Sequence, residues 1–180
     1  MIKPKIMQKQ ELIHKLQENH QALFSFVEAL SDEQFMASVD DKWTAGQELE
    51  HIYRSIKPLA HGLITPAFLF GLLFGKNNRA SRTYHELVEK YVEKLAAGAV
   101  ATPSFEPLAI ALDQKQELLE KNKKAIAKMI SYLQRFSEED LDKYVIPHPL
   151  LGKITLREMM YFTIYHAEHH LNNMKRNLGI

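Results

Sequence analysis

The sequence contains no cysteine among its 180 residues. This absence excludes disulfide bonds, thiolate metal ligands and a cysteine nucleophile. Any metal ion would therefore have to be bound by histidine, carboxylate and water. The chain contains nine histidines, which are the first candidates for such ligands.

The sequence also lacks an excess of charge of either sign. Lys and Arg number 23, Asp and Glu number 22, and the two kinds are mixed along the chain. No basic patch with interleaved aromatic residues is present, and we therefore expect no nucleic-acid partner. The apolar fraction of 46% and the charged fraction of 25% are ordinary for a globular protein. A chain of this length suits one domain, residues 1–180.

Long hydrophobic runs are missing as well. The first residues, MIKPKIMQKQELIHKL, contain no continuous apolar stretch of the kind found in signal peptides. Residues 58–75 carry no formal charge, but His61, Pro66 and three glycines make them a poor membrane span. We therefore expect a cytoplasmic protein without a membrane segment. The apolar residues 59–74 suit a subunit interface, so we also expect a homodimer.

A continuous helix pattern covers residues 155–177. Thr155 followed three residues later by Glu158 is a capping-box sequence, and neither Gly nor Pro interrupts the next turns. At about 100° per residue, one face of this helix, which we expect to point inward, carries Met159, Phe162, Thr163, His166, His170 and Met174. The opposite face, which we expect to be solvated, carries Arg157, Glu168 and Lys175.

His166 and His170 are spaced i and i+4 on the inward face of this helix. Two imidazoles one turn apart can bind the same metal ion. His169 leaves an alternative, because His166 and His169 can also converge. However, His169 lies about 60° from His166 on the side away from His170, so we favour the 166/170 pair. Histidines that only pack against other side chains would show the same spacing.

A third ligand must come from elsewhere in the chain, and His51 is the best candidate. Thr44 and Gln47 form another capping box, which predicts a helix beginning at Ala45. His51 lies at the border of the apolar face of this helix, with Glu48 about one turn before it. From that position the imidazole can point into a helical bundle. Glu48 can orient a ligand or act as a general base, although an exposed helical glutamate is an equal alternative.

The rest of the chain also reads as helices joined by loops. Apolar periodicity predicts four long helices, at residues 5–30, 45–65, 104–136 and 155–177. The long connection at residues 64–103 contains a further helical segment at residues 84–95. Ser31 and Ser137 each begin a short acidic turn after a long helix, which gives a weak internal repeat. We predict an all-α four-helix bundle with a long connection between helices 2 and 3.

Residues 145–152, VIPHPLLG, lie between the third and fourth long helices and are expected to form a loop. His148 stands between two prolines in this segment, and we interpret it as a turn residue. The alternative is a role at the metal site, because the fourth helix begins only a few residues later.

Three motifs, in this order, resemble those of the DinB/YfiT-like superfamily: WTAGQELEH at residues 43–51, HPLLGKITLREM at residues 148–159 and YHAEHH at residues 165–170. The likeness covers most of the chain outside residues 64–103. It implies a four-helix bundle of the DinB/YfiT-like type in which one histidine of the second helix and an HxxxH pair of the fourth hold a divalent metal ion. By position, those ligands are His51, His166 and His170, the residues already singled out by their spacing.

The resemblance also bears on activity. Relatives include thiol S-transferases and isomerases that use bacillithiol, mycothiol or glutathione, and proteins described as metal-dependent hydrolases. A three-histidine site leaves open positions on the metal, where water or a thiol loses its proton more readily. We therefore expect a metal-dependent thiol S-transferase or hydrolase that acts on a small molecule. Its metal would be zinc or nickel, with a low-molecular-weight thiol as a candidate cosubstrate, although iron or manganese also suits such a site. The alternative is a non-catalytic bundle that binds a metal or a small molecule.

Overall fold

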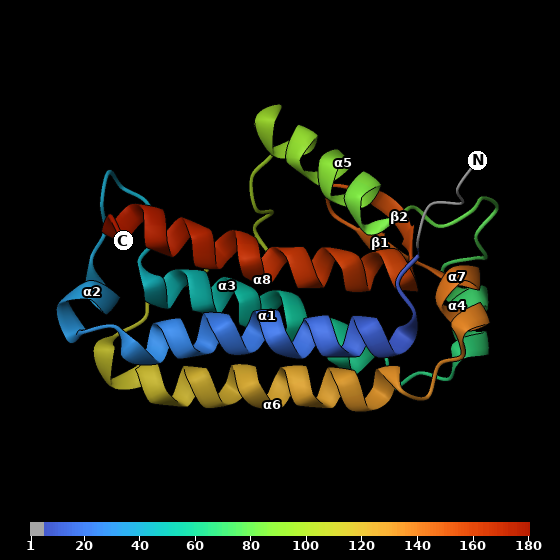
Figure 1. The fold of residues 1–180 in the computed structure, drawn as a ribbon, viewed down its shortest axis with the longest axis horizontal. Helices are drawn as coiled ribbons and strands as arrows, with labels where there is room; N and C mark the ends of the chain where they lie inside the picture. The colour runs from blue at the N-terminus through green and yellow to red at the C-terminus, as the bar shows by residue number, and fades with distance from the viewer. Residues whose placement is uncertain (1–5) are drawn as a thin grey trace.

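The computed structural model describes residues 6–180, and its largest elements are four long helices, which Figure 1 shows side by side. They are α1 (Lys9–Ala29), α3 (Ala45–Gly62), α6 (Lys115–Leu133) and α8 (Leu156–Leu178). The predicted four-helix bundle is therefore confirmed. The first helix begins later than the predicted range of 5–30, whose residue 5 lies outside the described part of the chain.

The order of the helices around the bundle differs from their order along the chain. α1 packs against α6 and α8, and α3 packs against the same two helices, so α1 and α3 lie on a diagonal. The colours in Figure 1 show that α1 and α8 run in one direction and α3 and α6 in the other. α3 and α8, which carry the candidate metal ligands, are therefore antiparallel neighbours.

The core forms where the apolar faces of the four helices meet. Leu12, Leu49, Met129 and Ile164, one from each long helix, are at most 1% exposed. Capping boxes define where several helices begin, because a Ser or Thr hydroxyl accepts from a backbone N–H that the helix itself leaves free. They are present at α2 (Asp32–Met36), α3, α5 (Tyr84–Ala96), α7 (Glu138–Lys143) and α8. The predicted boxes at Thr44 and Thr155 are among them.

The predicted third helix, residues 104–136, is wrong at its first end. Residues 104–111 are irregular, a short 3-10 turn follows at Leu112–Gln114, and α6 begins only at Lys115. Pro107 disfavours helical geometry in the residue before it. Leu108, an apolar residue within the predicted helix, is 62% exposed. The irregular segment packs beside α3, where the carbonyl of Phe105 contacts His51.

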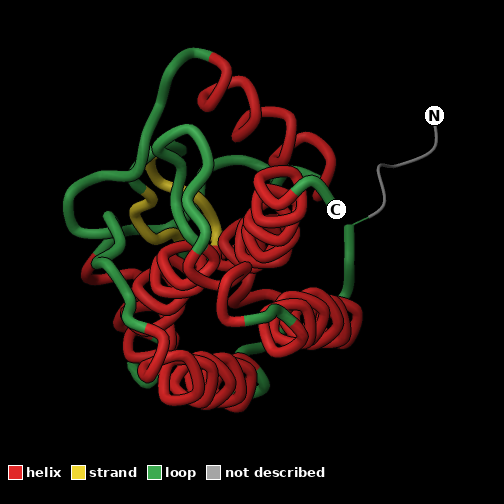
Figure 2. Tube along the Cα trace, turned by 90° about the vertical axis from the view of Figure 1, so that its left-hand side faces the viewer, coloured by secondary structure: helices red, strands yellow, loops and turns green. Residues whose placement is uncertain are grey.

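The predicted loop at residues 145–152 is also corrected, because most of it belongs to a β-hairpin. β1 (Val145–His148) pairs antiparallel with β2 (Gly152–Thr155), and Ile146 lies opposite Ile154. Both isoleucines are buried. The segment was too short and too rich in proline for its alternation to stand out. Together with α5, the hairpin lies to one side of the bundle (Figures 1 and 2).

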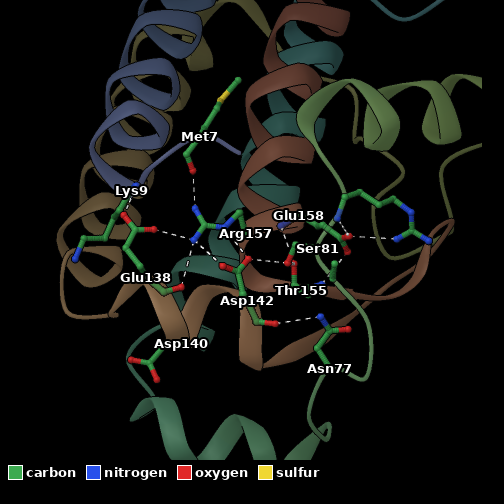
Figure 3. A network of polar contacts seen from close by, with 12 residues as sticks. Met7, Lys9, Asn77, Ser81, Glu138, Asp140, Asp142, Thr155, Arg157 and Glu158 are labelled. Carbon is green, nitrogen blue, oxygen red and sulfur yellow. Dashed lines mark hydrogen bonds and ion pairs between the residues drawn. The ribbon is translucent and has the colours of Figure 1, made fainter. Parts of the chain in front are cut away.

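Arg157, predicted to be solvated, is only 2% exposed. Its guanidinium donates to the carboxylates of Glu138 and Asp142 and to the backbone carbonyl of Met7, as Figure 3 shows. The prediction failed because α7 and the residues before α1 cover the start of α8, and helical periodicity does not include such neighbours. Glu168 and Lys175, on later turns, are exposed as expected.

Glu158 forms a second buried polar contact at the start of α8. Its carboxylate closes the capping box on the backbone N–H of Thr155 and also accepts two hydrogen bonds from Arg79, each 2.7 Å long. The backbone N–H of Arg82 donates to the same carboxylate. Burial alone would raise the pKa of Glu158, but these hydrogen bonds outweigh it and hold the pKa below its usual value. The polar loop before α5 is thereby tied to the helix that carries His166 and His170.

α4 (Ala67–Leu73) leaves apolar side chains uncovered in the single chain. Phe68, Leu72 and Leu73 are 63%, 78% and 64% exposed. No single helix in residues 6–180 is long and apolar enough to cross a membrane. α3 and α4 together meet the length and composition required, but they are bent by 104° relative to each other.

Replacing Glu158 with Ala is expected to lower the free energy of unfolding by about 3 kcal/mol, because Arg79 and two backbone N–H groups lose a buried acceptor. Glu86→Ala is the matched control, since Glu86 occupies the same capping-box position at α5 but is exposed. It should cost no more than about 1 kcal/mol. Urea unfolding followed by circular dichroism measures both. Equal losses would show that the contact with Arg79 contributes nothing.

Candidate metal centre

Three histidines from two antiparallel helices meet in the bundle. His51 comes from α3, and His166 and His170 come from successive turns of α8. The Nε2 atom of His166 lies 3.1 Å from Nε2 of His51 and 2.9 Å from Nε2 of His170. All three residues are at most 7% exposed. The structure thus brings together the three residues named from the sequence, although 115 positions separate His51 from His166.

The other ring nitrogens of two of these histidines have protein partners. His51 Nδ1 lies 2.7 Å from the carbonyl oxygen of Phe105, and His170 Nδ1 contacts Oε2 of Glu48. A carbonyl oxygen only accepts, so His51 carries its hydrogen on Nδ1 and a lone pair on Nε2. Partners of this kind fix the orientation of an imidazole and direct its second nitrogen to a metal.

Three neutral imidazoles cannot satisfy both Nε2 contacts by themselves. His166 Nε2 satisfies the lone pair of His51 only by donating a hydrogen to it. A ring nitrogen that donates has no lone pair left to accept from His170, and its one hydrogen cannot serve both neighbours. One contact in this buried cluster therefore stays unsatisfied, at a cost in free energy. A cation bound by three Nε2 lone pairs removes the conflict, so the donor set fits a metal ion.

The protonation states of the cluster also suit metal binding. Burial lowers the pKa of His51 to about 4 and that of His170 to about 3, and it holds the pKa of His166 well below its usual value. Neighbouring histidines lower the pKa of His51 and His166 further. At neutral pH all three side chains are therefore uncharged, the state in which an imidazole binds a metal.

Glu48 is buried beside His170 rather than exposed on its helix, with only 3% of its surface accessible. Burial raises the pKa of its carboxyl to about 7. Because burial also lowers the pKa of His170, a separated charge pair is disfavoured, and a hydrogen bond joins Glu48 Oε2 and His170 Nδ1. A cation at Nε2 of His170 would favour the carboxylate and place the hydrogen of this bond on Nδ1. Of the interpretations of Glu48 made from the sequence, the exposed glutamate is wrong, and the contact with His170 fits the orienting role.

His169 does not join the cluster. Its Nε2 atom lies 3.3 Å from Nδ2 of Asn173, one turn further along α8. The alternative pairing of His166 with His169 is therefore not seen in the geometry. The ring centroid of His169 is 5.1 Å from that of His170. His169 therefore borders the site, but it does not contribute a nitrogen to the point where the three Nε2 atoms meet.

Sequence reasoning missed two contributors to the site. The Phe105 carbonyl belongs to the segment that was assigned to a helix, and a backbone acceptor of this kind has no sequence signal. The second contributor, Trp43, is named in the sequence analysis only within the motif WTAGQELEH of residues 43–51. Its ring lies 5.1 Å from that of His51 and is stacked at 6.2 Å on that of His170. Trp43 stands directly before the N-cap of the helix that carries His51, and this position could have indicated that its ring lies near the site.

A cavity of about 500 Å³ opens beside the three histidines. Its walls come from α3, α4, α5, α8, the hairpin and the loop that follows α5. They include Trp43, Leu59, Phe70, Phe74, Tyr91, Phe105, His148, Met159, Phe162 and His169. The cluster therefore lies at the wall of a largely apolar chamber that is large enough for a small molecule. His148, predicted as a turn residue, is a buried residue of β1 in this wall.

Comparison with known proteins agrees with this architecture. The family model of the DinB superfamily matches residues 15–174. Among solved structures, YfiT from Bacillus subtilis is similar, with a TM-score of 0.53 and 22% sequence identity over 96% of this chain and 88% of that chain. That protein is described as a probable metal-dependent hydrolase with an unusual four-helix bundle topology. At this identity the likeness shows the fold. No curated protein matches the chain.

The metal-free protein is expected to lose stability as the pH falls from about 6.5, the usual histidine value. The folded protein holds the pKa of His51 and His148 at about 4 and that of His170 at about 3. Between these values the unfolded chain binds more protons, so the free energy of unfolding decreases as the pH decreases. Melting temperatures of chelator-treated protein between pH 7.5 and 4.5 measure this effect.

The exposed His85 provides the control for this pH dependence. His85→Ala should melt with the same pH dependence as the wild type, whereas His148→Asn should show a shallower one. A melting temperature that does not change with pH over this range would contradict the buried, neutral state of the cluster.

Proposed function

The chain belongs to the DinB superfamily, and from this premise we propose that it binds a divalent metal ion and uses it in an enzymatic reaction. The observation that carries the proposal is the convergence of three buried Nε2 atoms at the wall of a cavity. A structural metal site is normally closed by four protein ligands, whereas three ligands leave positions for water or substrate. Zinc or nickel suits a set of three neutral imidazoles.

Each residue of the site has a distinct part in this proposal. His51, His166 and His170 hold the ion, while the Phe105 carbonyl and Glu48 orient two of the rings. When bound, a divalent ion supplies a Lewis acid that lowers the pKa of a water molecule or thiol. Trp43 and the apolar walls limit the access of bulk water, which strengthens electrostatic interactions inside the cavity. Glu48 balances part of the charge of the ion, because its carboxylate form is favoured when a cation is present.

The reaction class that this arrangement supports is hydrolysis or thiol S-transfer on a small molecule. The description of YfiT as a probable metal-dependent hydrolase supports the first. Thiol S-transfer remains a proposal that comes from the family resemblance. A second candidate function is a non-catalytic bundle that binds a metal or a small molecule, and the size and apolar character of the cavity favour it.

Replacing His51, His166 or His170 with Ala is expected to weaken zinc binding by at least about tenfold, because only two imidazoles remain. His169→Ala is the matched control, since it removes an imidazole of the same helix that contacts Asn173 instead. Metal content and chelator competition are measured on protein purified without a histidine tag. Loss of metal in His169→Ala but not in His170→Ala would contradict the assignment.

The same variants separate the two candidate functions. Esters, amides and electrophiles are offered to the zinc- or nickel-loaded protein, with and without low-molecular-weight thiols. An enzyme should show turnover that chelation abolishes, that either metal restores and that the three ligand variants lack. Stoichiometric metal without turnover on any of these substrates would favour the non-catalytic function.

We also propose that the chain forms a homodimer through α4. Phe68, Leu72 and Leu73 present a cluster of exposed apolar side chains, and a second copy of the chain would remove it from water. Sedimentation velocity at micromolar concentration should give a dimer, and Leu72→Glu should shift it to monomer. Leu108→Glu is the control, because Leu108 is similarly exposed but lies outside α4. A monomeric wild-type protein would contradict the proposal.

A further inference from the structure

The cavity beside the three histidines is unusual in the chemistry of its walls. Among the described residues that line it, none is Asp, Glu, Lys or Arg. Several polar groups in the wall already have protein partners: Ser55 donates to the backbone carbonyl of His51, and the side-chain oxygen of Asn173 accepts from Arg176. A charged group on a ligand would find no side chain of opposite charge here, and burial of an unpaired charge is strongly unfavourable.

His148 is a polar side chain of this wall whose orientation the protein fixes. Its Nδ1 atom accepts from the backbone N–H groups of Leu150 and Leu151, at 3.1 and 3.2 Å. A neutral imidazole whose Nδ1 accepts must carry its hydrogen on Nε2. The residue is only 8% exposed, and within residues 6–180 no protein acceptor contacts its Nε2. The hairpin therefore fixes one tautomer and leaves the Nε2 donor of a mostly buried ring without a protein partner in residues 6–180.

His148 lies close to the candidate metal centre. Its ring packs at 4.2 Å on Phe162, and the other neighbour of Phe162 is His166, stacked at 4.7 Å. One aromatic ring thus separates His148 from the three-histidine cluster. His148 and the three histidines line the same cavity.

We propose that the cavity binds an uncharged, mainly apolar small molecule, and that His148 positions it by donating its Nε2 hydrogen to an oxygen of that molecule. Binding of this molecule does not depend on the proposed function. Only the reaction that would follow binding rests on it. The proposal also favours hydrolysis of a neutral substrate over transfer to a thiol that bears several carboxylates, because the described wall contains no Lys or Arg to pair with them. The volume of about 500 Å³ suits a ligand of modest size.

Three probes of similar shape test the proposal: acetophenone, which is neutral and accepts a hydrogen bond, ethylbenzene, which does not accept one, and 4-acetylbenzoate, which adds a carboxylate. Binding is measured by ligand-observed NMR with competition, on metal-free and zinc-loaded protein. Acetophenone should bind about three- to tenfold more tightly than ethylbenzene, the effect of one neutral hydrogen bond. In the metal-free protein, 4-acetylbenzoate should bind at least about tenfold more weakly than acetophenone.

Two substitutions separate the donor of His148 from its structural role. In His148→Asn the side-chain oxygen can still accept from Leu150 and Leu151, but the Nε2 donor is lost. This variant should keep its melting temperature and lose the preference for acetophenone over ethylbenzene. In His148→Gln the amide can replace the donor but not the Nδ1 acceptor, so this variant should melt lower and keep the preference.

The proposal is overturned if His148→Asn keeps the preference, if the carboxylate probe binds the metal-free protein as tightly as acetophenone, or if neither neutral probe binds at millimolar concentration. These outcomes are independent of the proposed function. A protein that binds no metal can still show the probe preferences, and one that binds zinc stoichiometrically can still lack them.

Discussion

The contact between His170 Nδ1 and Glu48 Oε2 joins the two helices on which the rest of the site depends. Both residues are buried, so neither a lone carboxylate nor a lone imidazolium is favourable there, and each is the hydrogen-bond partner of the other. The contact fixes the rotation of α8 against α3 at the level where His51 and His166 also meet. It thereby links bundle packing directly to the charge state of the candidate metal centre.

The same helix is held at its other end by buried charges. Arg157 and Glu158 are adjacent in sequence, yet one contacts α7 and the residues before α1, and the other contacts the loop before α5 (Figure 3). These contacts determine where α8 begins. Because α8 is one continuous helix, they also help to fix the positions of His166 and His170. The fixed start of α8 and the contact of His170 with Glu48 together pre-organise three Nε2 atoms that would otherwise repel one another.

The connections that lie outside the bundle contribute the remaining half of the site. The loop after α5 supplies the Phe105 carbonyl, and the hairpin supplies His148 with a fixed tautomer. With α5, they enclose an apolar cavity against one side of the bundle. The site is thus built from two parts of the fold: the helices carry the three histidines, and the connections form much of the cavity beside them.

The sequence by itself determined the long helices, their caps and the three histidines on inward faces, because local hydrogen bonds and helical periodicity act over a few residues. The tertiary structure alone decided that Arg157 is buried, that residues 104–111 leave the helix to contact His51, and that Glu48 meets His170. It also turned residues 145–155 into a hairpin that orients His148. Each of these features depends on residues that are far apart in the sequence. Such contacts stabilise the protein only after the two segments have packed together, and a local sequence pattern therefore does not reveal them.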